Sequence, residues 1–379
     1  MSGAAADAAV LVSLDLGDSG YAESLEELKL LADSAGVRAV ALVEGKRQHP
    51  DASTFAGSGK VDEIAGTVER TGAGLVVFNH DLSPAQMRNL AGRIDARVID
   101  RTMLILDIFA QRAQSHEGKV QVELAQLKYL STRLAGMNRD MGQQKNAVGA
   151  RGPGEMQLEL DRRKLDKRVH LLNERLRKLK RQREVRRRAR SRADVLSVSL
   201  VGYTNAGKST LFNRLTQAGV YAADQLFATL DTTSRRIFLS GSEGGAQVVL
   251  SDTVGFIRHL PHSLIAAFRG TLEETAQADL LLHVVDANSP ERHEQISEVN
   301  KVLHEIGADR IPQILVFNKI DLAGLPPDVQ HDEYGRIARI HVSAKTGAGM
   351  DDLRAALAAM RDECALPDEA PPQAWHPLD

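Results

Sequence analysis

Short apolar runs alternate with amphipathic segments along the first hundred residues. Four runs predict β-strands, at Val10–Asp15, Val40–Val43, Leu75–Phe78 and Val98–Ile99. Between them the spacing predicts helices over 23–34 and 60–71 and another that starts at Ser83, where the serine can cap and Pro84 suits the first turn. Gly36 stands where helices usually stop. Strands alternating with helices predict a small parallel α/β domain.

The pattern then becomes helical, nearly without interruption from Arg101 to about Met137. One apolar stripe consists of Val120, Leu124, Leu127 and Leu134, and a second of Leu158, Leu165, Val169, Leu172, Leu176 and Leu179. Spacings of three and four predict an antiparallel helical hairpin with a coiled-coil seam. Its second helix should run over 155–191. Residues 139–155, rich in glycine, predict an exposed tip loop.

A second α/β pattern begins at Val195–Val201, an alternating segment that predicts a buried strand. The next eight residues, 202–209, fit G-x-x-x-x-G-K-[ST], and a helical pattern follows at Thr210–Leu215. Strand, glycine loop and helix in this order are typical of a phosphate-binding loop, whose backbone N–H groups point at a phosphate chain. Lys208 would reach the β- and γ-phosphates, and the Ser209 hydroxyl would ligate Mg²⁺.

Three later motifs select the nucleotide. Asn318–Asp321 follows the apolar strand Ile314–Phe317 and fits N-K-x-D, in which the aspartate accepts hydrogen bonds from guanine N1–H and the N2 amine. Ser343–Lys345 follows another short strand, over 339–342, and fits the second base-contacting loop. Asp252–Gly255 fits D-x-x-G, with the aspartate on Mg²⁺ through water and the glycine N–H on the γ-phosphate. Together they predict a GTP site.

The first switch is expected at Phe227–Thr233, and Thr229 is our choice of Mg²⁺ ligand because Phe-x-Thr-Leu resembles the corresponding segment of Obg-type GTPases; Thr232 and Thr233 stay open. Phe256 occupies the position of the water-orienting glutamine of Ras-like proteins, so no catalytic residue is assigned. The predicted nucleotide-binding residues are Gly202, Tyr203, Thr204, Asn205, Ala206, Gly207, Lys208, Ser209, Thr210, Phe227, Ala228, Thr229, Leu230, Asp231, Asp252, Thr253, Val254, Gly255, Asn318, Lys319, Ile320, Asp321, Ser343, Ala344 and Lys345.

Asn205 resembles the asparagine of potassium-activated GTPases, which leaves K⁺ open as a cofactor beside GTP or GDP and Mg²⁺. Gly57–Lys60 could be mistaken for a second phosphate loop. It lacks the full spacing, so a turn before a helix is favoured there.

Charge singles out one stretch. The net charge is −2, yet Arg162–Arg192 holds sixteen Lys or Arg against three acids. A basic block in an otherwise acidic chain favours a polyanionic partner. Lys145 and Arg151 in the tip loop are the predicted RNA contacts, although a plain connector and a solvated helix face remain open. The single cysteine, Cys364, and the lack of a signal peptide or long apolar run predict a cytosolic protein without integral membrane segments.

These motifs resemble those of the HflX family of translational GTPases. Beyond the nucleotide motifs, the resemblance is carried by Leu82–Gln86, Asn89–Leu90, Asp100–Phe109, Gln121–Leu127, Gly149–Glu155 and Gly202–Asn205. It implies a ribosome-associated GTPase that binds the large (50S) subunit and its RNA, dissociates or rescues stalled or idle ribosomes under stress, and is stimulated by the ribosome. It also implies a tip that approaches the peptidyl-transferase region. The 14-residue tail lacks the longer C-terminal domain of some relatives.

We therefore expect the α/β class, with an N-terminal domain over 1–112, a basic hairpin over 113–193, a G domain with a mostly parallel six-stranded sheet over 194–364, and a Pro-rich tail over 365–379. A monomer that binds no DNA is expected, with peripheral membrane association left open. The alternative functions are a GTP-regulated RNA-binding or scaffold protein, and a GTPase that acts on a membrane or protein client.

Overall fold

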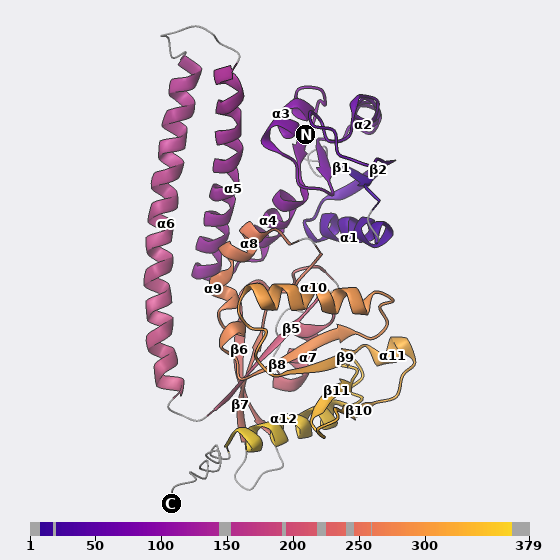
Figure 1. Cartoon of the computed structure of the whole chain (residues 1–379), viewed down its shortest axis with the longest axis vertical. Coiled ribbons are helices and arrows are strands. Elements are labelled where there is room, and N and C mark those ends of the chain that lie inside the picture. Colours follow the sequence, from indigo (N-terminus) through magenta and orange to yellow (C-terminus); the bar gives the residue numbers. More distant parts are fainter. Residues whose placement is uncertain are drawn as a thin grey trace, which may run out of the picture. The chain divides into compact units, whose positions relative to one another are not determined.

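The computed structural model describes residues 8–17, 20–143, 153–191, 195–217, 225–239, 246–258 and 260–365 (Figure 1). Most of the predicted tip loop and tail, including Lys145 and Arg151, lies outside the described residues. The chain divides into two compact units. The first comprises 1–182, 223–231 and 254–271, and the second comprises 183–222, 232–253 and 272–379. The first unit thus joins the predicted N-terminal domain and most of the hairpin to two short segments from later in the chain.

The first unit contains a four-stranded parallel sheet in the order β2-β1-β3-β4, as the alternating pattern predicted. Its strands are β1 (Ala8–Asp15), β2 (Arg38–Lys46), β3 (Leu75–Phe78) and β4 (Arg97–Ile99), and its helices are α1 (Tyr21–Ser34), α2 (Ser58–Thr71), α3 (Pro84–Ala91) and α4 (Arg101–Arg112). Val10, Val12 and Leu14 of β1 share a core with α2 and α3. The order predicts α1 on the opposite face, because right-handed crossovers that step in opposite directions cover opposite faces.

Local signals set the helix ends as expected. The Ser83 side chain accepts from Gln86 N, and the Gln86 side chain accepts from Ser83 N, which completes a capping box. Gly36, just past α1, has a φ of 72°. Gly57 has the same φ and directly precedes α2, which begins at Ser58, as the predicted turn before a helix requires.

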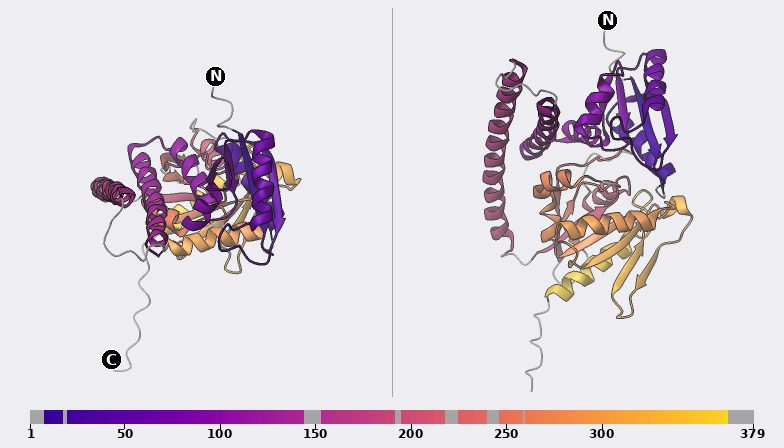
Figure 2. Two further views of the ribbon diagram at one scale, coloured as in Figure 1. Left: turned by 90° about the horizontal axis from the view of Figure 1, so that it is seen from above. Right: turned by 45° about the horizontal axis from the view of Figure 1, so that its top comes forward.

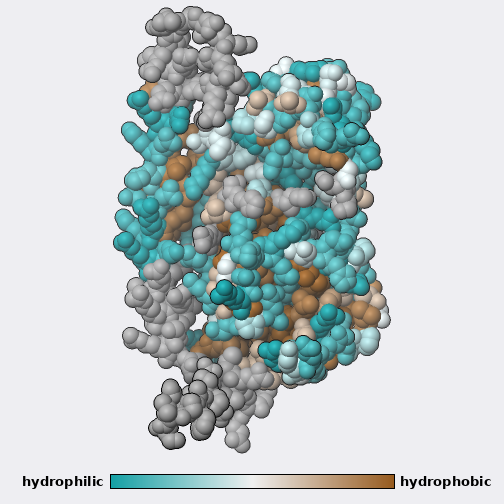
Figure 3. Space-filling model, viewed as in Figure 1, coloured by the Kyte–Doolittle hydropathy of each residue, from teal (hydrophilic) through white to brown (hydrophobic). Residues whose placement is uncertain are grey.

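The helical hairpin forms from α5 (His116–Gln143) and α6 (Pro153–Ser191), which we call the arm (Figure 1). Its seam contains Val120, Leu124 and Leu172 as buried residues, with Leu127, Val169 and Leu176 packed against them. The side chains of Leu134 and Leu158 lie outside the described residues. Figure 3 shows apolar side chains between hydrophilic outer faces along this pair. The two predicted stripes are thus the contact between the helices.

The helical stretch predicted from Arg101 to about Met137 forms two helices, α4 and α5, with a short break between them. The chain leaves helical geometry after Arg112, with Ala113 at ψ 110°, and α5 begins anew at His116. Ser115 caps the new helix, since its Oγ accepts from Gly118 N at 2.8 Å. Capping chemistry therefore interrupts a pattern whose apolar spacing alone looked continuous.

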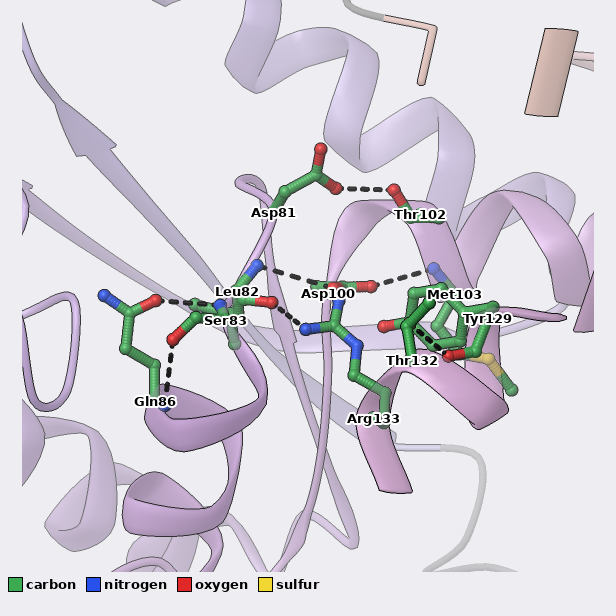
Figure 4. A network of polar contacts seen from close by, with 10 residues as sticks. All are labelled: Asp81, Leu82, Ser83, Gln86, Asp100, Thr102, Met103, Tyr129, Thr132 and Arg133. Carbon is green, nitrogen blue, oxygen red and sulfur yellow. Dashed lines mark hydrogen bonds and ion pairs between the residues drawn. The ribbon is translucent and has the colours of Figure 1, made fainter. Parts of the chain in front are cut away.

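A buried polar network fastens α5 to the sheet (Figure 4). Arg133 of α5 forms an ion pair with Asp100 at 2.6 Å and donates to Leu82 O. Asp100 also caps α4 by accepting from Met103 N at 2.9 Å. Burial raises the pKa of Asp100, and burial beside Asp100 raises the pKa of Tyr129, over whose ring the Arg133 guanidinium lies at 4.6 Å. These bonds hold one turn of α5 against the loop before α3 and the start of α4.

The second unit is built on a seven-stranded sheet in the order β10-β11-β9-β8-β5-β7-β6 (Figure 2). Its strands are β5 (Leu196–Gly202), β6 (Thr233–Leu239), β7 (Ala246–Asp252), β8 (Leu280–Asp286), β9 (Gln313–Asn318), β10 (Asp328–His331) and β11 (Ile337–His341). The sheet has one strand more than the predicted six: β10, polar and exposed, pairs antiparallel with β11 at the edge. Its sequence carries no apolar alternation.

Helices cover both faces of this sheet. They are α7 (Lys208–Thr216), α10 (Arg292–Glu305) and α12 (Met350–Ala365), with the shorter α11 (Ile320–Ala323) and η1 (Thr275–Gln277). α7 and α12 share a core with alternate residues of the central strands, Val198 and Leu200 among them. The short helices α8 (His262–Ala267) and α9 (Arg269–Leu272) follow the D-x-x-G segment. No helix among the described residues is long and apolar enough to cross a membrane.

Candidate functional site

The loop between β5 and α7 needs its two terminal glycines. Gly202 has a φ of 148°, and a Cβ on it would lie 2.2 Å from Val284 O. Gly207 has a φ of 92°, and a Cβ on it would lie 2.2 Å from Asn318 Nδ2. Side chains at either position would meet backbone or a buried amide. The predicted loop geometry therefore depends on close approach to β8 and β9 as well as on backbone turns.

Lys208 lies inside this loop with 6% of its surface exposed. Its Nζ donates to Gly202 O at 3.0 Å and to Tyr203 O at 2.7 Å. Burial lowers the pKa of Lys208 to about 8, an effect that Asp252 opposes and Lys319 reinforces. Thr204 Oγ1 nearby is a buried side-chain atom without a hydrogen-bond partner in the described structure. A buried ammonium and an unsatisfied hydroxyl suit an incoming polyphosphate, whose oxygens can accept from both.

Ser209 and Asp252 come together at the ends of α7 and β7. The Ser209 hydroxyl donates to Asp252 Oδ2 at 2.7 Å, and Asp252 is fully buried. Thr253 Oγ1 donates to Leu200 O at 2.5 Å and fixes the backbone that follows. A hydroxyl beside a carboxylate is an oxygen donor set that Mg²⁺ accepts, directly or through water. These residues therefore fit the expected metal.

The base-reading motifs are joined to the phosphate loop by Asn318. Its Nδ2 donates to Ala206 O at 2.9 Å, and its Oδ1 accepts from Ala344 N at 2.9 Å. One amide thus links all three predicted motifs and is 2% exposed. Because both its donor and its acceptor are used, neither aspartate nor leucine could replace it.

Asp321 and Lys319, in the same motif as Asn318, are each held by a neighbouring side chain. Ser343 Oγ donates to Asp321 Oδ1 at 2.7 Å, which leaves the Asp321 carboxylate exposed at the end of the strand. Lys319 adopts a φ of 65° and forms an ion pair with Asp286 at 2.8 Å. A carboxylate oriented by a hydroxyl can accept the two N–H groups of guanine, whereas adenine offers no such pair. Lys345 is exposed and Ile320 is buried next to these groups.

His283 lies in β8, the strand next to β5, and is 1% exposed. Burial lowers its pKa to about 4 from an ordinary 6.5. The folded protein therefore binds this proton less well than the unfolded chain, so stability that is full above pH 6.5 is lost as the pH falls toward 4. The shift corresponds to about 3 kcal/mol of unfolding free energy.

We expect His283→Gln to flatten this acid-side loss of stability, measured by chemical denaturation between pH 7 and 4. His293→Gln is the matched control, because His293 is an exposed histidine of the same unit. Equal pH slopes for the wild type and His283→Gln would contradict the assignment.

Of the predicted first switch, residues 227–231 belong to the first unit, whereas Thr232 and Thr233 belong to the second. Phe227 is buried at a φ of 56° and packs edge-on against Phe109, whose ring also meets Phe268. Phe256 is fully buried, and its phenyl ring carries no hydrogen-bonding group that could orient a water. The Asp231 carboxylate accepts hydrogen bonds at the start of α5, a partner that its predicted nucleotide role did not include.

The segment after Gly255 is also bound to the first unit. Arg101 pairs with Glu27, both buried, and its guanidinium donates to Arg258 O at 3.3 Å and Asn79 Oδ1 at 2.8 Å. The sequence did not predict the ion pairs of Arg101 with Glu27 and of Lys319 with Asp286, because charges that pair across more than thirty residues leave no local spacing. The available signal in the sequence was an arginine shortly after a predicted strand, at the start of an apolar helix.

Comparison with known proteins agrees with this geometry. Three family models match consecutive parts of the chain: "GTP-binding GTPase N-terminal" over residues 22–110, "GTP-binding GTPase Middle Region" over 112–190 and "50S ribosome-binding GTPase" over 197–319. Proteins called GTPase HflX are similar over most of the chain. The one from Escherichia coli K12 is 54% identical over 93% of this chain and 82% of its own. The one from Lacrimispora saccharolytica is 48% identical over 91% and 80%.

Among solved structures, the chain resembles one described as "crystal structure of SsGBP and GDP complex", with a TM-score of 0.51 and 24% identity over 94% of this chain and 99% of that one. This likeness supports the fold. The similarity to these two relatives covers more than nine tenths of the chain.

Proposed function

Because the chain belongs to the HflX family of GTPases, we propose that it binds GTP and Mg²⁺ through the residues above and uses hydrolysis to govern its binding to the large ribosomal subunit. GTP hydrolysis itself follows from the family. The finer proposal is that the bound protein dissociates or rescues stalled or idle ribosomes under stress. The name of the matching family model, "50S ribosome-binding GTPase", supports this partner.

The observation that carries the proposal is the exposed basic surface of α6. Between residues 160 and 182, ten Lys or Arg side chains are exposed: Arg162, Arg163, Lys164, Lys167, Arg168, Arg175, Arg177, Lys178, Lys180 and Arg181. The apolar residues of this helix are largely used in the seam, so its outer faces present cations. Such a surface neutralises phosphates and suits ribosomal RNA.

Phe256, at the position of the water-orienting glutamine, has no group that can hydrogen-bond a water. We therefore propose that ribosomal contact supplies or orders the missing group and accelerates hydrolysis. Asn205, exposed in the phosphate loop at a φ of 59°, supports K⁺ as a further activator. Lys145 and Arg151 stay proposed RNA contacts of the tip, and a monomer stays the proposed state.

The test is GTP turnover with and without large ribosomal subunits, together with co-sedimentation in GDP, GTP and a non-hydrolysable analogue. We expect turnover to rise at least about tenfold with subunits and binding to follow the triphosphate. Equal turnover with and without subunits would contradict the proposed activation by the ribosome. Equal co-sedimentation with GDP, GTP and the analogue would contradict the proposed nucleotide switch. Replacing sodium by potassium in the same assay tests the role of Asn205.

A charge-reversal variant tests the basic surface. Arg177→Glu with Lys178→Glu and Lys180→Glu should abolish co-sedimentation while leaving turnover without subunits unchanged. Arg235→Glu with Arg236→Glu, on exposed positions of β6, is the matched control. If the wild type binds anionic vesicles rather than ribosomal subunits, a membrane client is favoured. Lys145→Ala with Arg151→Ala separates binding from splitting.

A further inference from the structure

Asp231 reaches the start of the arm from 116 residues further along the chain. Its Oδ2 accepts from Gln114 N at 2.8 Å and from Ser115 N at 2.7 Å, and its Oδ1 accepts from Ser115 Oγ at 2.5 Å. These are the residues just before α5. A carboxylate at this end also interacts favourably with the helix dipole. All of these residues belong to the first unit.

The hydrogen bonds around Ser115 allow only one assignment of donors and acceptors. Its hydroxyl accepts from Gly118 N, so its single proton is free to go to Asp231. In a capping box, the acceptor of the N-cap N–H is a Glu or Gln three residues into the helix. Here that position is Gly118, which has no side chain. Asp231 therefore performs, from a distant segment, the role that a local side chain normally has.

Gly118 makes room for this partner. A Cβ on it would lie 2.1 Å from Asp231 Oδ1 and 3.0 Å from its Cγ. Gly118 does not have a positive φ, so the backbone alone does not require a glycine there. Glycine is a poor residue for the first turn of a helix. The close approach of Asp231 is the feature that explains it.

The other end of the same segment is also anchored to the first unit. Leu226 N donates to Ser34 Oγ at 2.9 Å, Gln225 accepts from Arg112, and Phe227 packs on Phe109. Thr229 thus lies between anchors at Phe227 and Asp231. Two residues of extended chain reach about 7 Å at most. Any larger movement of Thr229 must release one of the anchors.

The helix that Asp231 caps is itself fixed. The Asp100–Arg133 network holds α5 to the loop before α3 and to the start of α4, as Figure 4 shows. A displacement of the first turn of α5 would therefore also displace the rest of the arm and the N-terminal sheet.

We propose that Asp231 and Gly118 form a latch that joins the Thr229 segment to the first turn of the arm. Asp231 is then a positioning residue for the metal ligand, and the nucleotide state and the placement of the arm form one coupled equilibrium. The latch rests on the proposed role of Thr229 as the Mg²⁺ ligand. The test below uses the chain without ribosomes, so the proposed partner does not affect it.

The test measures the Mg²⁺ concentration for half-maximal GTP hydrolysis by the full chain. Asp231→Ala and Gly118→Ala should each raise it about fivefold to tenfold, a range that coupling between sites commonly spans. Asp231→Asn should restore a near-normal value, because its amide oxygen can accept both backbone N–H groups and its NH₂ can donate to Ser115 Oγ. GDP binding shows that each variant is folded.

Ser83→Ala is the matched control, since it removes a cap of the same kind from α3. It should cost comparable stability and leave the Mg²⁺ requirement unchanged. Gly118→Ala sharpens the comparison: alanine favours helix more than glycine, so a cap with a merely structural role would leave this variant normal. The latch is refuted if Gly118→Ala and Asp231→Ala keep the wild-type Mg²⁺ requirement while folded.

Thr229→Ala distinguishes a failure of the latch from a failure of Thr229 as the proposed metal ligand. If it raises the Mg²⁺ requirement and the latch variants do not, the latch alone fails. If Thr229→Ala changes nothing, the proposed metal ligand fails and the latch fails with it. Should Asp231→Ala not fold, Gly118→Ala decides alone, because it leaves the carboxylate intact and only displaces it.

Discussion

Replacing Lys208 with methionine is expected to abolish GTP and GDP binding while leaving the nucleotide-free protein at least as stable as the wild type. The ammonium is buried and donates to two loop carbonyls. Charge-assisted bonds to phosphate contribute about 1.5–3 kcal/mol each, so losing two of them lowers the affinity by at least about a hundredfold. Methionine fills a similar volume without a charge to bury.

The pH dependence of the unfolding free energy should also differ between Lys208→Met and the wild type, in a direction that follows from the pKa of Lys208. The pKa of Lys208 in the folded protein is about 8, below its ordinary 10.5, because burial disfavours the charged form. The unfolded chain therefore binds the proton better, and the wild type without nucleotide should gain stability as the pH rises from 8 to 10.5. Lys208→Met should lack that gain.

Chemical denaturation with and without GDP measures both effects. Lys301→Met is the matched control, since Lys301 is an exposed lysine of α10 in the same unit. A stabilising effect of GDP that survives in Lys208→Met would show that the phosphates are bound elsewhere. A large loss of stability without nucleotide would show that the buried ammonium is a favourable part of the fold.

Asp321→Asn is expected to change the preferred base from guanine to xanthine. Asparagine presents an amide NH₂ where the carboxylate accepted the guanine amine, so two donors would face one another. Xanthine has a carbonyl at that position and can accept the new donor. Loss of hydrogen bonds to a charged group, each about 1.5–3 kcal/mol, predicts about 10²-fold to 10³-fold weaker guanine binding.

Competition between GDP and xanthosine diphosphate for the purified variant measures this preference. The Ser343 hydroxyl, at 2.7 Å from Asp321 Oδ1, should hold the new side chain in the same place. Asp328→Asn on the edge strand β10 serves as the control, because it removes an exposed carboxylate of the same unit. An unchanged guanine preference in Asp321→Asn would mean that another group reads the base.

The sequence by itself determined the elements whose signals are local. Apolar periodicity predicted the strands around Val10 and Val76 and the seam through Leu124 and Leu172, because each pattern repeats within a few residues. Motif order predicted which segments would meet at the end of the second sheet. Asn318 and Ala206, 112 residues apart, are indeed bonded there.

Tertiary structure decided what long-range contacts control. The break before α5 is stabilised by Asp231, 116 residues further along the chain, and the loop that holds Lys208 closely approaches Val284 and Asn318. Asp231 is the clearest example: as sequence it belongs to a nucleotide motif, yet its carboxylate caps a helix 116 residues away in a space that Gly118 leaves open. Local spacing encodes which residues share a face, whereas the pairing of charges and caps depends on how the folded chain brings distant segments together.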